Sequence, residues 1–276
     1  MFGFLNNKKE EAVLLIDIGN GSITAAIALF SEKRNPVFLF TTKNSFVNLE
    51  KPDALELTDS MKRILDETLS TLMEKGFRHQ YWENRDRGLF KVLVALSSPW
   101  FIPKIKHIQI KKDKAFAVTE AFIDDILKKE EEIFKEELKR DFENEKDGAF
   151  EIVEKSIVNI KINGYVLREI IGKRTDNFDA YLSMSVVPGS LMNKVRDVIM
   201  QHTHVSQEKI VTHTFPLVSF SVARDVFSHH SDFIMMDTTG EVTDLTLARN
   251  DSIVGSASFP SGRNFIIRQI SKAFNT

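Results

Sequence analysis

No cysteine occurs in this chain, which excludes disulfide bridges and thiolate metal sites. An excess of one charge is missing too, because 37 basic against 39 acidic residues leave a net charge of -2. A global field that would attract nucleic acid is therefore not expected. Apolar runs approaching the roughly 18 residues of a membrane span are also lacking, and residues 1–11 have no signal-peptide core. We expect a cytoplasmic protein that binds no nucleic acid.

The first hundred residues follow an α/β pattern. Residues 13–30 read as two strands joined by a glycine-containing turn, and residues 37–41 as a third strand. Apolar positions at helical spacing predict a helix over 59–75, which Gly76 ends. A continuous apolar run over 90–96 predicts another buried strand. Strands alternating with a helix in this order indicate a layered α/β lobe.

The pattern changes between residues 101 and 187. Here the sequence predicts a basic strand over 103–110 and a long charged helix from Thr119 to about residue 144, broken by Asp147-Gly148. Asn163-Gly164 is the strongest short hairpin signal in the chain. The strands expected around and after it cover 152–162, 165–171 and 181–187. We interpret this stretch as a small α+β subdomain inserted into the first lobe.

The last third returns to the α/β pattern. The expected elements are a helix over 190–201, a strand over 210–214, a helix over 217–227, three strands within 233–259 and a helix over 263–274. Residues 229–231 are the expected crossing into a second lobe.

Two segments far apart share one design, an apolar strand that ends in aspartate and leads into a tight polar turn with glycine. Glycine lets backbone amides approach phosphate oxygens closely, and hydroxyl groups add hydrogen bonds. The aspartates would hold Mg²⁺, usually through water. Either turn alone is also consistent with a plain hairpin, but the repeat favours phosphate binding. The candidate phosphate-binding residues are Gly19, Asn20, Gly21, Ser22, Thr238, Thr239 and Gly240, and the candidate Mg²⁺-side carboxylates are Asp17 and Asp237.

The hairpin pair resembles the phosphate-1 and phosphate-2 motifs of the actin, heat-shock-chaperone and sugar-kinase superfamily. Residues 91–98, the charged helix, residues 159–165 and residues 180–187 together resemble the inserted 1C, or SHS2-type, subdomain of FtsA-type bacterial cell-division proteins. PilM-type pilus-assembly proteins share that insertion. Residues 259–266 also resemble the segment that follows phosphate-2 in both groups.

The resemblance implies an actin-like, ribonuclease H-like α/β fold with an inserted α+β SHS2-type subdomain. The first lobe would comprise 1–100 and 188–228, the insertion 101–187, and an incomplete second lobe 229–276. The chain ends soon after phosphate-2, so we expect a fragment of a longer protein. Membrane contact at the inner face of the cell membrane would then involve only residues absent from this chain.

The resemblance further implies a scaffold that binds Mg-ATP, self-associates, and docks either a tubulin-like cell-division partner or a pilus-assembly partner. Two departures bear on its chemistry. Glu241 replaces a glycine of the second turn, where its carboxylate would repel phosphate unless it points away. Phe215 stands where many relatives have a water-orienting Glu or Gln, so at most weak ATP hydrolysis is expected. A PilM-like adaptor, a small-molecule kinase and a degenerate scaffold that binds no nucleotide remain alternatives.

Overall fold

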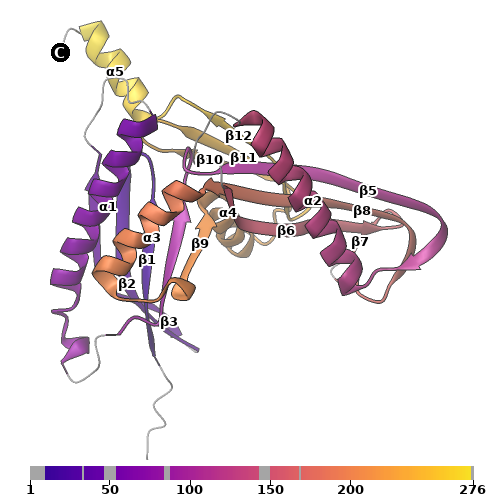
Figure 1. Cartoon of the computed structure of the whole chain (residues 1–276), viewed down its shortest axis with the longest axis horizontal. Coiled ribbons are helices and arrows are strands. Elements are labelled where there is room, and N and C mark those ends of the chain that lie inside the picture. The colour runs from indigo at the N-terminus through magenta and orange to yellow at the C-terminus, as the bar shows by residue number, and fades with distance from the viewer. Residues whose placement is uncertain are drawn as a thin grey trace, which may run out of the picture.

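The computed structural model describes residues 10–32, 34–46, 54–83, 88–142, 150–167 and 169–274. The strands among these residues form three sheets, whose arrangement is seen in Figure 1. A five-stranded sheet with two helices on one side forms the main lobe, a three-stranded sheet lies at one end of it, and a four-stranded sheet projects sideways. Within the described residues, no helix is both long enough and apolar enough to span a membrane.

The five-stranded sheet has the order β3-β2-β1-β4-β9. Its strands are β1 (Glu11–Ile18), β2 (Ser22–Ser31), β3 (Arg34–Ser45), β4 (Lys91–Leu96) and β9 (Ile210–Thr214). β1, β2 and β3 form an antiparallel meander, whereas β4 and β9 run parallel to β1. Parallel neighbours need crossover connections, and the helices of these connections supply the cover for one face.

That cover consists of α1 (Ala54–Gly76) and α3 (Gly189–Thr203), which pack on each other and on the sheet. Fully buried Leu14 and Ile16 alternate along β1 with less buried residues, as expected of a strand whose two faces differ. The largest core of the molecule lies between these helices and the sheet. Short 3₁₀ turns follow the two helices at Gln80–Trp82 and Gln207–Lys209.

The projecting sheet is formed by the part of the chain between β4 and α3, which we call the insertion. It has the strand order β5-β8-β6-β7 and antiparallel pairing throughout. Its elements are β5 (Ile102–Ala117), α2 (Glu120–Asp141), β6 (Phe150–Ile162), β7 (Tyr165–Val166) and β8 (Arg174–Pro188). α2 lies across one face of this sheet (Figure 1). Thr119 caps the helix by accepting a hydrogen bond from the Phe122 amide at 3.1 Å.

The third sheet is the meander β10 (Phe233–Thr238), β11 (Thr243–Arg249) and β12 (Ser252–Phe259), followed by α5 (Arg263–Phe274). α4 (Phe215–Val226) leaves the main lobe at the end of β9 and reaches this sheet. Phe220 of α4 stacks on Phe233 with ring centroids 6.0 Å apart, and a small core forms around Phe220, Ala248 and Ile253.

Most predicted elements are present, and the differences lie at their ends. β9 and α5 have the predicted bounds, whereas α1 begins at Ala54, β5 extends to Ala117 and β8 starts already at Arg174. The strand predicted over 165–171 is wrong in length, since β7 stops at Val166. Its continuation turns at Gly172, whose φ of 82° is left-handed. The predicted break at Asp147-Gly148 lies outside the described residues.

Candidate site where the two hairpin turns meet

The structure brings the two aspartate-terminated hairpins into contact. A Cβ placed on Gly21 would lie 2.7 Å from the Cα of Gly240, and one placed on Gly240 would lie 2.5 Å from the Cα of Gly21. Side chains are not accommodated at such distances, so this approach requires glycine in both turns. The pairing that the sequence suggested from two separate segments is therefore a direct backbone contact.

Asn20 connects the turns through its side chain, which is only 1% exposed. Its Oδ1 accepts hydrogen bonds from the Glu241 amide at 2.6 Å and from the Thr239 hydroxyl at 3.0 Å. Its Nδ2 donates to the carbonyl oxygen of Ser98. The carboxamide thus joins the first hairpin, the end of β4 and the second hairpin.

The two candidate Mg²⁺-side carboxylates also lie near each other. The pKa of Asp17 is raised to about 6, mainly by burial and also by the negative charge of Asp237, whereas Lys43 acts in the opposite direction. Burial likewise raises the pKa of Asp237, with Asp244 as a second cause. Among the residues that the structure describes, the buried Oδ1 of Asp17 finds no hydrogen-bond partner. A buried carboxylate oxygen in this situation favours either a proton or a cation.

Asp244 makes a second connection between the three-stranded sheet and the segment after β4, beside the one made by Asn20. Its Oδ1 accepts from the Ser258 hydroxyl at 2.5 Å and its Oδ2 from the Ser98 amide at 3.4 Å. The hydroxyl groups of Ser98 and Ser258 are 3.2 Å apart. The end of β4 therefore holds the three-stranded sheet through Ser98 as well as through Asn20.

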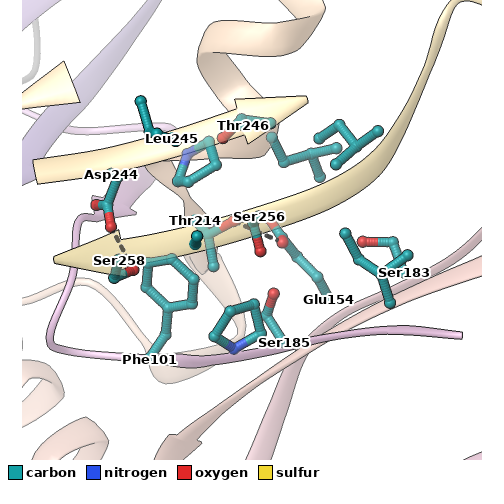
Figure 2. A pocket seen from close by; sticks show the side chains of 16 residues that line it. Phe101, Glu154, Ser183, Ser185, Thr214, Asp244, Leu245, Thr246, Ser256 and Ser258 are labelled. Atoms are coloured by element: carbon teal, nitrogen blue, oxygen red, sulfur yellow. Dashed lines mark hydrogen bonds between the residues drawn. The ribbon is translucent and has the colours of Figure 1, made fainter. Parts of the chain in front are cut away.

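Figure 2 shows a small pocket next to this connection. Its volume is about 30 Å³. Its wall includes hydroxyl-bearing side chains from β8, β11 and β12 and the carboxylate of Glu154. Glu154 accepts hydrogen bonds from the amide and the hydroxyl of Thr214 at 2.7 and 2.8 Å. Such a volume holds about one or two water molecules, so this is a polar junction between the insertion and the lobes rather than a ligand site.

The remaining residues of the first predicted turn shape the hairpin itself. The Gly19 amide donates to the Ser22 carbonyl at 3.1 Å and closes the turn, while Trp100 Nε1 donates to the Gly19 carbonyl at 3.0 Å. In the second turn, Thr238 is exposed and lies 3.4 Å from the Thr243 hydroxyl. These residues stand beside the contact between the turns, whereas the side chains of Asn20 and Thr239 span it.

Glu241 points away from the contact, toward α5. Its carboxylate accepts from Asn264 at 2.9 Å and from two nitrogens of Arg268 at 2.7 and 3.1 Å. These hydrogen bonds, those from Arg268 above all, lower the pKa of Glu241. Sequence reasoning missed this role, although Asn264 and Arg268 are four positions apart on a predicted helix and so share a face.

The site suits the Mg²⁺ ion of Mg-ATP, but in this arrangement it does not suit the phosphates. The carboxylate side is suited to a hydrated cation, because Asp17 has an unsatisfied oxygen near Asp237. Across the described part of the chain, no group of three or more His, Asp or Glu side chains is placed to hold a metal, so further ligands would have to come from water or phosphate. The phosphate side does not fit in the arrangement shown, because Asn20 already occupies the Glu241 amide and Gly21 touches Gly240.

Phe215 stands at the start of α4 and lines an open, mainly apolar hollow of about 500 Å³. The hollow lies on the sheet face opposite α1 and α3, bordered by Phe38 and Val218, with Asp17 also in its wall. An aromatic ring here packs against apolar neighbours and offers no acceptor for a proton.

Comparison with solved structures identifies the architecture. The structure of the PilM–PilN type IV pilus biogenesis complex superposes with a TM-score of 0.56 at 15% identity, covering 96% of this chain and 66% of that chain. This chain therefore spans less than two thirds of that relative's length. A Bacteroides thetaiotaomicron protein with an actin-like ATPase fold gives 0.43 at 12% identity, covering 100% and 80%. MreB 5 of Spiroplasma citri bound to AMPPNP gives 0.38 at 10%, covering 96% and 56%.

No protein-family model matches the chain, and neither does any curated protein sequence. The chain shares the fold of the PilM–PilN structure, an actin-like α/β fold as the sequence predicted. At these identities the similarity establishes fold and nothing finer.

Proposed function

We propose that this protein is an actin-like scaffold that binds Mg-ATP at its facing hairpins and couples that binding to the docking of a partner protein. The observation that carries the proposal is Asp17, whose buried Oδ1 lacks a hydrogen-bond partner among the described residues and lies near Asp237. An arrangement that raises the pKa of two neighbouring carboxylates and leaves a buried oxygen of one of them without a partner is costly unless a cation uses it.

In this proposal Asp17 and Asp237 hold Mg²⁺ through water, and the two turns receive the phosphates. The candidate phosphate contacts are Gly19, Gly21, Ser22, Thr238, Thr239 and Gly240, whereas the side chain of Asn20, which bridges the turns, would have to move aside. Bound Mg²⁺ would supply charge neutralisation between the carboxylates and the phosphates. Turnover is expected to be slow at most, because Phe215 offers no acceptor to orient water. Binding, through a shift between open and closed forms, would carry the signal.

Calorimetric titration of the full chain with Mg-ATP tests this proposal. Asp17→Ala and Asp237→Ala should each weaken binding by about tenfold or more, because each removes a charge that the cation requires. Asp225→Ala is the matched control, since Asp225 is an exposed aspartate on α4 and should leave the affinity unchanged. Equal affinities for the wild type and Asp17→Ala would reject the proposal.

Two classes of partner remain open. A tubulin-like cell-division protein, together with self-association, is the FtsA-type alternative, and a pilus-assembly protein at the inner face of the cell membrane is the PilM-type alternative. Similarity to the PilM–PilN structure supports the second only at the level of fold. Capture of a purified tubulin-like protein, set against capture of a membrane-protein N-terminal segment, separates them, and sedimentation with and without Mg-ATP tests self-association.

A scaffold that works without nucleotide is the second candidate, and Asn20 is the observation that favours it. The hairpins are already joined by protein groups, so closure of the lobes requires no ligand in this arrangement. If neither the wild type nor any hairpin variant binds Mg-ATP, this candidate replaces the first.

A further inference from the structure

We infer that Asn20 is the protein's own substitute for a phosphate group. Its carboxamide fills the anion position between the hairpins, holds the hairpins closed without nucleotide, and has to be displaced before a phosphate can enter. The displacement step rests on the proposed function, whereas the closure is independent of it.

The hydrogen bonds of Asn20 Oδ1 match those expected of a phosphate oxygen. It accepts from the backbone amide of Glu241 at 2.6 Å and from the Thr239 hydroxyl at 3.0 Å. A backbone amide and a hydroxyl from a glycine-containing turn are the donors that such turns direct at phosphate. A carboxamide oxygen has the same acceptor capacity without the charge.

The absence of charge matters at this position. Asp17 lies three positions before Asn20, is largely buried, and is near the carboxylate of Asp237. A phosphate here would add negative charge and would need a cation with it, whereas the neutral Asn20 needs none. The closed arrangement can therefore exist in the absence of metal and nucleotide.

The side-chain nitrogen of Asn20 also helps to keep the two hairpins together. Its Nδ2 donates to the Ser98 carbonyl, so the same side chain is anchored at the end of β4. Along the chain, Asn20 is 78 positions from Ser98, 221 from Glu241 and 219 from Thr239. An asparagine that only stabilised its own turn would bond to its immediate neighbours. This side chain instead joins distant parts of the molecule.

The contact between Gly21 and Gly240 also limits the entry of a phosphate between the hairpins. Gly21 and Gly240 approach so closely that a Cβ on either would lie within 2.7 Å of the other's Cα. A phosphate oxygen would have to take both the Asn20 Oδ1 position and some of the space that now separates these two backbones. Phosphate binding and the Asn20 bridge are therefore alternatives that exclude each other.

Distance measurement without nucleotide tests the closure. The chain contains no cysteine, so Ser70→Cys and Gln269→Cys, both exposed on α1 and α5, provide a single spin-label pair. The parent should give one narrow distance distribution, and Asn20→Ala should broaden it and shift it to longer distances. Asn44→Ala is the matched control, because Asn44 bonds Thr68 at 3.1 Å within the main lobe. Identical distributions for the parent and Asn20→Ala would overturn the inference.

Titration with Mg-ATP tests the competition. Asn20→Ala should bind about tenfold or more tightly than the wild type, because the ligand no longer displaces the carboxamide bonds. Equal affinities would overturn the displacement step. If neither protein binds Mg-ATP while the label distances differ, Asn20 remains the closing residue and the proposed function fails instead.

Two further variants keep the test decisive if Asn20→Ala does not fold. Asn20→Ser retains a polar group but cannot reach both Ser98 and Glu241, so it should give an intermediate distance distribution. Asn20→Asp keeps the size but adds a third carboxylate near Asp17 and Asp237, and should separate the hairpins most at pH 8. A narrow, parent-like distribution for both variants contradicts the inference.

Discussion

At the scale of single residues, Asp17 shows how one position can oppose folding and still suit a function. It lies near the end of β1, an apolar strand that is buried on one face, and the fold places it beside Asp237. Desolvation and the second carboxylate both disfavour its charged form. Lys43 compensates only in part. The protein therefore carries an ionisable group whose native environment prefers a proton or a cation.

The pH dependence of stability follows from this environment. With a folded pKa of about 6 against 3.8 when unfolded, the native state binds more protons between these values. The free energy of unfolding should fall as pH rises from about 4 through 6. Asp17→Asn should raise it at pH 8 by at most about 3 kcal/mol, and change it little below pH 4.

Urea unfolding at a series of pH values measures this effect. The difference between wild type and Asp17→Asn should grow with pH up to about 7 and then level off. Asp225→Asn, on an exposed part of α4, should show no such trend. Parallel pH profiles for the wild type and Asp17→Asn would contradict the prediction.

At the scale of elements, the two hairpins depend on glycine at one contact. In Gly240→Ala the new methyl group would lie 2.5 Å from Gly21 Cα and 2.9 Å from its nitrogen. Backbone atoms cannot rotate aside as a side chain can, so the hairpins have to separate. We expect a loss of about 1–3 kcal/mol in the free energy of unfolding.

Gly255→Ala is the control for this substitution, because it lies in β12 of the same sheet with its nearest heavy atom, Leu247 Cβ, 3.9 Å away. Thermal unfolding should show a lower midpoint for Gly240→Ala and a nearly unchanged one for Gly255→Ala. Equal midpoints for these two variants would mean that the hairpins separate without any loss of stability.

α5 depends on the second hairpin for its position. The amides of Arg263 and Asn264 donate to the carbonyls of Thr239 and Gly240 at 2.9 and 2.8 Å, and Arg268 pairs with Glu241. Arg268→Met should speed amide hydrogen exchange in α5 by about fivefold or more, since it removes charge-assisted bonds. It should also let the pKa of Glu241 rise toward its ordinary value.

Hydrogen exchange followed by mass spectrometry measures the change in α5. Lys272→Met removes an exposed cation from the same helix and should leave the exchange unaltered. Similar rates in the wild type and Arg268→Met would show that the first-turn bonds alone hold the helix.

At the scale of the whole molecule, the insertion is joined to the end of β9 by one buried carboxylate, that of Glu154. Glu154 of β6 receives both hydrogen bonds of Thr214, at the junction of β9 and α4. Glu154→Gln leaves only one acceptor oxygen for two donors, so the free energy of unfolding should drop by about 1–3 kcal/mol.

Chemical unfolding of Glu154→Gln, Thr214→Val and the double variant measures this junction. The two effects should not add, because both substitutions disrupt the same contact. Glu132→Gln, exposed on α2, serves as the control. Full additivity would mean that Glu154 and Thr214 act independently.

The order of strands and helices could be read from the sequence because it depends on local patterns. Apolar runs, helical spacing and the Asn163-Gly164 turn, with φ of 51° and 85°, act over a few residues. Element ends were less predictable. β8 starts at Arg174 instead of 181 because it pairs with β5 on one side and β6 on the other. Pairing partners of that kind are distant in the chain.

Two aspartate-terminated hairpins with glycine in both turns follow from the sequence, since these are properties of short segments. What lies between the hairpins depends on the three-dimensional fold. It turned Glu241 toward Arg268, placed Phe215 against an apolar hollow, and directed Asn20 at Ser98 and Glu241. Each of these contacts joins residues that the fold alone brings together, and a side chain's hydrogen bonds depend on what surrounds it in space rather than along the chain.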